Sequence, residues 1–170
     1  MDSIKIFRQN SALECSCWPA KHKVILEIAP AYPDKPKGQP QPGSKLYDYT
    51  KKIKISFGPN DILKFRYALL KHSNGEAEDY KKMADMSKVA GSTDTDKKSL
   101  GVNLNANGGV GFFLSKGTER LNIVLDKSDA FALAEWLLAT YNGFYLAQIV
   151  ASLLNIAREG GSDDDSTDND

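Results

Sequence analysis

Short stretches in which apolar and polar residues alternate with a period of two constrain the fold of this chain most strongly. Successive side chains on a β-strand point to opposite faces, so this period gives each strand one apolar face. The pattern and its turn signals predict strands at residues 4–7, 12–18, 23–29 and 46–57, and a three-stranded meander over residues 98–125. The chain is therefore predicted to form antiparallel sheets with one buried face each.

Helix signals follow each of the two groups of strands. The segment 58–61 reads Gly-Pro-Asn-Asp, which ends a strand and can cap a short helix over residues 62–71. Ser128 is a good N-cap, with Asp129 in the first turn, for a long helix to residue 157. We therefore predict an α+β fold of two antiparallel β-sheets, each followed by a helix.

Two segments lack a regular pattern. Residues 30–45 contain five prolines and are interpreted as a loop. Residues 73–98 are polar and poor in aromatic side chains, and we expect a mobile connection there.

The charge of the chain is distributed unevenly. The last twelve residues, 159–170, hold six acidic residues and no basic one, so the remainder has 22 basic residues against 16 acidic ones. A basic body suggests a polyanionic partner. The tail has too few apolar residues to fold. We predict a nucleic-acid-binding domain over residues 1–158 and a disordered acidic tail over residues 159–170.

No arrangement of side chains in the sequence indicates catalysis. Cys15 and Cys17 are too close together for the usual zinc spacing, and they are interpreted as a reduced pair. His22 and His72 stand beside lysines and are expected at the surface. The glycines before Val110 precede a strand and not a helix, so they do not form a phosphate loop. We expect a protein that is not an enzyme, with no cofactor and no metal site.

No secretory leader, transit peptide or long apolar run is apparent in the sequence. Together with the reduced cysteines, this predicts a cytoplasmic protein without a membrane span, associated with the nucleoid or with a phage-infected host cell.

Three segments resemble the Whirly family of single-stranded DNA-binding proteins. They are the strand that ends in Pro30-Ala31, the segment Tyr47-Asp48-Tyr49, and the junction Gly58-Pro59-Asn60-Asp61 between a strand and a helix. The Lys98-Ser99-Leu100 strand, the glycine-rich turn and Lys127-Ser128 follow in the same order. The resemblance covers most of residues 4–150. It implies a Whirly-like fold and tetramers built through the helices.

The sequence also departs from the family pattern. The lysine-glycine-lysine-alanine-alanine-leucine stretch, which the family uses for higher-order assembly, is replaced here by residues 8–13, Arg-Gln-Asn-Ser-Ala-Leu. Ala29 stands where a tryptophan is usual. Since no transit peptide is apparent, we expect a prokaryotic or phage-like member with an acidic tail.

The strand pattern by itself predicts a binding face. If the apolar residues point inward, their neighbours form an outer surface that mixes basic and aromatic side chains. Cations follow phosphates and exposed rings stack on bases, as single-stranded nucleic acid requires. The alternative is that the rings are core or subunit contacts and the lysines are merely solvated. The candidate residues are Lys5, Phe7, Trp18, Lys23, Lys52, Lys54, Phe113, Lys116 and Arg120.

The final helix is apolar around most of its circumference, whereas one sheet buries a single stripe. We therefore expect a homotetramer built through residues 128–157, the alternative being a helix buried between two sheets of a monomer. The leading interpretation is a largely sequence-independent single-stranded DNA-binding protein of replication, recombination or repair, whose tail recruits partners of those processes. The alternatives are an RNA-binding or RNA-annealing protein, or a transcriptional cofactor of the same fold.

Overall fold

The computed structural model describes residues 3–34, 46–76, 80–84, 97–104 and 109–160. Its elements form two antiparallel four-stranded sheets, each followed by an α-helix, as predicted. Sheet 1 contains, in spatial order, β1 (Ser3–Phe7), β2 (Ser11–Trp18), β3 (Lys23–Pro30) and β4 (Ile53–Phe57). Sheet 2 contains β5 (Tyr80–Ala84), β6 (Lys98–Leu104), β7 (Val110–Lys116) and β8 (Glu119–Leu125). The helices are α1 (Pro59–Ser73) and α2 (Lys127–Gly160).

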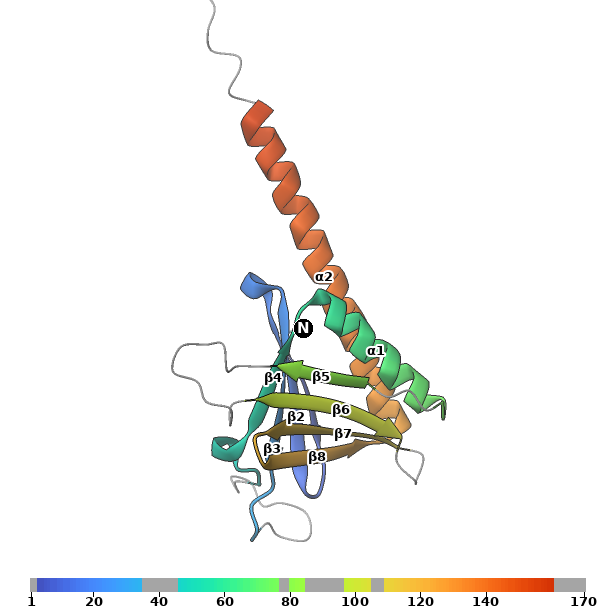
Figure 1. Cartoon of the computed structure of the whole chain (residues 1–170). Coiled ribbons are helices and arrows are strands. Elements are labelled where there is room, and N and C mark those ends of the chain that lie inside the picture. The colour runs from blue at the N-terminus through green and yellow to red at the C-terminus, as the bar shows by residue number, and fades with distance from the viewer. Residues whose placement is uncertain (1–2, 35–45, 77–79, 85–96, 105–108, 161–170) are drawn as a thin grey trace, which may run out of the picture.

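The strands of the two sheets cross, and α1 and α2 lie side by side along them (Figure 1). Phe65 of α1 joins the two sheets in the core. Its ring stacks on Phe57 of sheet 1 at a centroid distance of 5.2 Å, and it meets Phe112 of sheet 2 edge-on at 6.2 Å. All three side chains are fully buried. The inward-facing residues that the period of two identified therefore form one continuous core.

The end of the β1–β2 hairpin lies against β8, the edge strand of sheet 2. Arg8 donates from Nε to the carbonyl of Val124 at 3.1 Å and forms ion pairs with Asp126 and Asp129. Ser11 donates from Oγ to the carbonyl of Asn122 at 2.8 Å. These contacts satisfy carbonyls of an edge strand that would otherwise be free to pair with another chain.

Two of the predicted element assignments are wrong. Residues 46–57 do not form one strand, because a 3-10 turn, Tyr49–Lys51, interrupts it before β4. The carboxylate of Asp48 accepts hydrogen bonds from the backbone N–H and the hydroxyl of Thr50, which stabilises that turn. Residues 80–84, expected within a mobile connection, form β5 because they pair with β6. Residues 85–96 lie outside the described part.

His72, which was expected at the surface, is 1% exposed and lies on the buried face of α1. Its neighbouring Lys71 points outward to Glu76, so local charge was a poor guide to the burial of His72.

The helix α2 continues three residues beyond the predicted end at residue 157, while residues 161–170 of the predicted tail lie outside the described residues. Within it, residues 127–155 are long and apolar enough, by length and composition, to cross a membrane. The expectation that no such segment exists is therefore wrong: small and amide residues interrupt the apolar ones without making the segment polar. Its first half packs in the core, where Leu133 and Leu137 are fully buried. Its second half projects beyond the sheets (Figure 1).

Candidate nucleic-acid interface

The outer face of sheet 1 carries a row of four charged residues, one on each strand. Lys5, Glu14, Glu27 and Lys54 are neighbours in the register of β1 to β4. Lys5 pairs with Glu14 at 3.4 Å, and Lys52, which precedes β4, pairs with Glu27 at 2.7 Å. The lysines therefore lie on the outer strands and the carboxylates on the central ones. The sequence prediction found the lysines but missed these two glutamates.

Aromatic rings border this charged row at the end of the β1–β2 hairpin. Phe7 is 53% exposed and stacks on Tyr47 at a centroid distance of 5.6 Å. Tyr47 is buried beneath it, and its hydroxyl donates to the carbonyl of Arg8 at 2.7 Å. Phe7 is thus held in place from below while much of its surface stays open to solvent.

Tyr49 is an exposed ring that the list of candidate site residues omitted. It is the first residue of the 3-10 turn that Asp48 caps, and its pKa is raised by partial burial and by the charge of Glu14. The hydrogen bonds from Thr50 lower the pKa of Asp48, so the carboxylate that holds the turn is ionised at neutral pH. The Tyr-Asp-Tyr segment could have drawn attention to Tyr49 in the sequence. Only the structure shows that its ring is exposed and so open to a ligand.

Trp18 and Lys23 face outward at the other end of sheet 1, where they are paired in register. The indole of Trp18 is 47% exposed, and the ammonium group of Lys21 lies 5.6 Å from the ring centroid. This end of the sheet therefore offers one open aromatic surface together with two cations.

On sheet 2, Phe113 and Arg120 form a single stacked unit on the outer face. The guanidinium carbon of Arg120 lies 3.6 Å from the centroid of the Phe113 ring. Arg120 also donates from Nε to Oδ1 of Asn122 at 3.1 Å. Beneath the ring lies Gly101, where a Cβ atom would come within 2.4 Å of the ring carbons.

Lys116 does not share this face. It has the same strand parity as the inward-facing Leu114, and it reaches solvent only because β7 ends there. In the register, Lys116 stands between Lys98 of β6 and Glu119 of β8. Lys97 and Lys98, which the candidate list omitted, add positive charge at this end of sheet 2.

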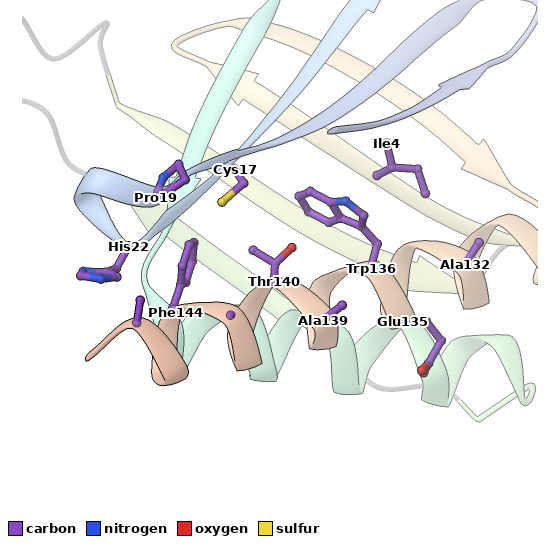
Figure 2. A pocket seen from close by; sticks show the side chains of 12 residues that line it. Ile4, Cys17, Pro19, His22, Ala132, Glu135, Trp136, Ala139, Thr140 and Phe144 are labelled. Atoms are coloured by element: carbon purple, nitrogen blue, oxygen red, sulfur yellow. The ribbon is translucent and has the colours of Figure 1, made fainter. Parts of the chain in front are cut away.

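An apolar groove of about 770 Å³ lies between α2 and the turn that joins β2 to β3. Figure 2 shows Trp136, Thr140 and Phe144 extending from α2 toward Cys17 and Pro19. The floor along α2 is built from small residues, Ala139, Gly143 and Ala147, which allow another helix to approach closely. The groove is lined by Ile4, Cys17, Pro19, His22, Ala132, Glu135, Trp136, Ala139, Thr140, Gly143, Phe144 and Ala147.

Neither Cys15 nor Cys17 forms a disulfide, and both lie on the inner side of sheet 1. Burial raises the pKa of Cys15, so its thiol stays protonated and is a poor metal ligand. Among the described residues, no group of three or more histidine, cysteine and acidic side chains could hold a metal ion.

Known proteins resemble this chain in structure but not detectably in sequence. No protein-family model and no curated protein matches the sequence. Two solved structures from Arabidopsis thaliana match, WHY3 and WHY1. WHY3 has a TM-score of 0.62 at 15% identity, with 93% of this chain and 96% of that chain covered. WHY1 has a TM-score of 0.59 at 17% identity, with 82% and 87% covered.

A third match is the plant transcriptional regulator PBF-2, with a TM-score of 0.59 at 14% identity and 89% and 86% of the two chains covered. The agreement extends over nearly the whole of each chain, although few residues are identical. The protein therefore has the Whirly fold.

Proposed function

We propose that the protein binds single-stranded nucleic acid, chiefly single-stranded DNA, with little sequence preference and without catalysing a reaction. The observation that carries this proposal is the outer face of sheet 1, where exposed Phe7 and Trp18 stand among lysines. Each of these rings has an exposed surface with cations on the same sheet face, which is the combination that single-stranded nucleic acid requires. Stacking on a ring requires no particular base, because every base has a π-face.

The lysines of this face supply the second half of the interaction. Lys23 and Lys54 have no acidic partner among the described residues, so both are available to phosphates. Lys5 and Lys52 are held by carboxylates and contribute less. Binding should therefore weaken with added salt, with a slope near −0.7 for each phosphate that the protein neutralises.

Competition binding tests the proposal. A labelled single-stranded DNA is displaced by unlabelled single-stranded DNA, RNA and duplex DNA of matched length. We expect single-stranded DNA to compete best and duplex DNA worst. Equal competition by duplex DNA would overturn the proposal, and stronger competition by RNA would favour an RNA-binding or RNA-annealing protein.

The proposed assembly is a homotetramer built through α2. Six large apolar side chains of its second half are more than two-fifths exposed, and this row is too long to be left open to water. We infer that the equivalent helix of a second copy covers this row. The groove beside Trp136 can bind such a helix, because its lining is apolar and its floor along α2 consists of small residues. The exposed residues are Tyr145, Leu146, Ile149, Val150, Leu153 and Leu154.

The proposed biological role is coating of single-stranded DNA during replication, recombination or repair, with the acidic tail recruiting proteins of those processes. A transcriptional role is the second candidate, since one of the structural matches is described as a plant transcriptional regulator. Sequence preference separates the two candidates. A DNA-coating protein should bind unrelated single strands of one length alike, whereas a regulator should favour one sequence.

A further inference from the structure

Arg120 is the one arginine with a described side chain that has no acidic partner among the described residues. Arg8 pairs with Asp126 and Asp129, and Arg66 of α1 pairs with Glu135 of α2. Those two arginines fasten parts of the fold together. Arg120 instead lies exposed on the outer face of β8, so its charge has no structural role of that kind.

The guanidinium of Arg120 is nevertheless held in one orientation. Its central carbon lies over the ring of Phe113, 3.6 Å from the centroid, and its Nε donates to Oδ1 of Asn122. A long exposed side chain loses conformational entropy when it binds a ligand. The ring and the amide fix Arg120 before any ligand arrives, which reduces that loss.

The residue of β6 that lies against the Phe113 ring is a glycine, which leaves room for the ring. Phe113 is opposite Gly101 in the register, and a Cβ atom there would lie 2.4 Å from Cε1 and 2.5 Å from Cζ of the ring. Any other residue would displace the ring from the sheet surface. Gly101, Phe113 and Arg120 therefore form three layers, with the guanidinium outermost.

We propose that Arg120 is the base-stacking residue of sheet 2: one face of its guanidinium rests on Phe113, and the other receives a nucleobase. Gly101 and Asn122 are positioning residues that act through Phe113 and Arg120. This inference rests on the proposed function and changes the part played by Phe113, whose ring face is covered by the guanidinium. A planar guanidinium stacks on aromatic faces, whereas the ammonium group of a lysine does not.

The test compares two ligands, a labelled oligothymidine and an abasic strand of equal length, which retains the sugar-phosphate chain but has no bases. The decisive variant is Arg120→Lys, which keeps the charge and removes the plane. We expect it to bind oligothymidine roughly 5- to 30-fold more weakly than the wild type, with an unchanged salt slope. On the abasic strand, the variant and the wild type should bind equally.

Gly101→Ala tests the positioning role, because it removes no ligand-facing atom and acts only by displacing the Phe113 ring beneath Arg120. It should reproduce the selective loss on oligothymidine. Gly111→Ala, whose Cβ would lie nearest to the side chain of Asn103, should bind like the wild type. Asn122→Ala, which removes the edge contact at an exposed position, provides the same test if Gly101→Ala fails to fold.

The two possible failures are distinguishable. If the wild type does not bind oligothymidine, the proposed function fails. If the wild type binds oligothymidine and Arg120→Lys binds it equally well, only the role of Arg120 is overturned. An equal loss on both strands would also overturn it, because Arg120 would then contact phosphate and not a base.

Discussion

At the scale of single residues, exposure separates the aromatic side chains that can meet a ligand from those that cannot. The two tryptophans are the clearest pair, since Trp18 is 47% exposed and Trp136 is 5% exposed. Phe7 and Tyr49 belong with Trp18, whereas Tyr47 supports Phe7 from beneath. Phe7 is therefore the exposed ring that a second aromatic residue fixes without covering it.

Intrinsic fluorescence should report binding through Trp18. We expect single-stranded DNA to quench the emission of the wild type and of Trp136→Phe, because stacked bases reach only the exposed indole. In Trp18→Leu the quenching should vanish, and the binding free energy should become less favourable by about 1–3 kcal/mol. Quenching that persists in Trp18→Leu would place the bases elsewhere on the protein.

At the scale of elements, the β1–β2 hairpin is attached to sheet 2 by side chains and not by a strand ladder. Arg8 reaches one carbonyl of β8, Asp126 just before α2 and Asp129 in the first turn of α2, so one guanidinium links the hairpin, β8 and α2. Its several donors make this possible. Residues 8–13 stand where the Whirly pattern has its lysine-rich stretch. The cation of this segment, Arg8, forms its ion pairs within the same chain.

Removing that link should destabilise the protein. Arg8→Met should lower the free energy of unfolding by about 1–3 kcal/mol, because hydrogen bonds to a charged group are lost. Arg8→Lys should recover only part of the loss, since an ammonium group cannot reach all three partners at once. Urea unfolding measures the difference, with the exposed Lys64→Met as the control. A lysine variant as stable as the wild type would contradict this role.

The second half of α2 should determine assembly. The double variant Leu146→Glu with Val150→Glu places two charges in the exposed apolar row, and we expect the mass from light scattering to fall toward the monomer value of 18.7 kDa. Gln148→Glu adds a charge on the same helix at a position already polar, and it should leave the mass unchanged. A wild type that already has the monomer mass would refute the proposed tetramer.

At the scale of the whole molecule, charge is divided between the basic body and the acidic tail. The chain has no net charge, although the residues before 159 carry six more basic than acidic side chains. Six carboxylates at the end of the same chain can compete with DNA phosphates for the lysines. We therefore expect the affinity for single-stranded DNA to depend on the tail as well as on the sheets.

Truncation after Arg158 should tighten binding of single-stranded DNA at low salt and change it much less at high salt, where the competition is screened. Salt-dependent anisotropy on the full chain and the truncated chain measures this effect. A full-length variant with the six acidic residues of the tail replaced by Asn or Gln controls for chain length. Unchanged affinity at low ionic strength would leave the tail with a role in solubility or partner recruitment.

The period of two by itself determined the strands within residues 4–29 and 98–125 and the inward faces of those strands, and turn and cap signals determined that a helix follows each group. These features follow from local patterns, because strand parity and capping are properties of neighbouring residues. The predicted N-cap Ser128 is nevertheless wrong by two residues, since α2 begins at Lys127 and the carboxylate of Asp126 accepts from the N–H of Asp129. Local patterns failed where a distant partner decided the outcome. The residues of β5 become a strand only by pairing with β6, and His72 is buried only because α1 packs on the sheets.

The residues of the candidate site also fall into those that the sequence predicted and those that only the tertiary structure revealed. The sequence identified its lysines and rings, since alternation places them outside. Only the tertiary structure showed that Glu14 and Glu27 occupy the centre of the charged row, that Tyr49 is exposed, and that Lys116 belongs to the other face. Only the structure placed Arg120 over Phe113 and Phe113 over Gly101, because that stack joins three strands that approach one another only when sheet 2 has formed.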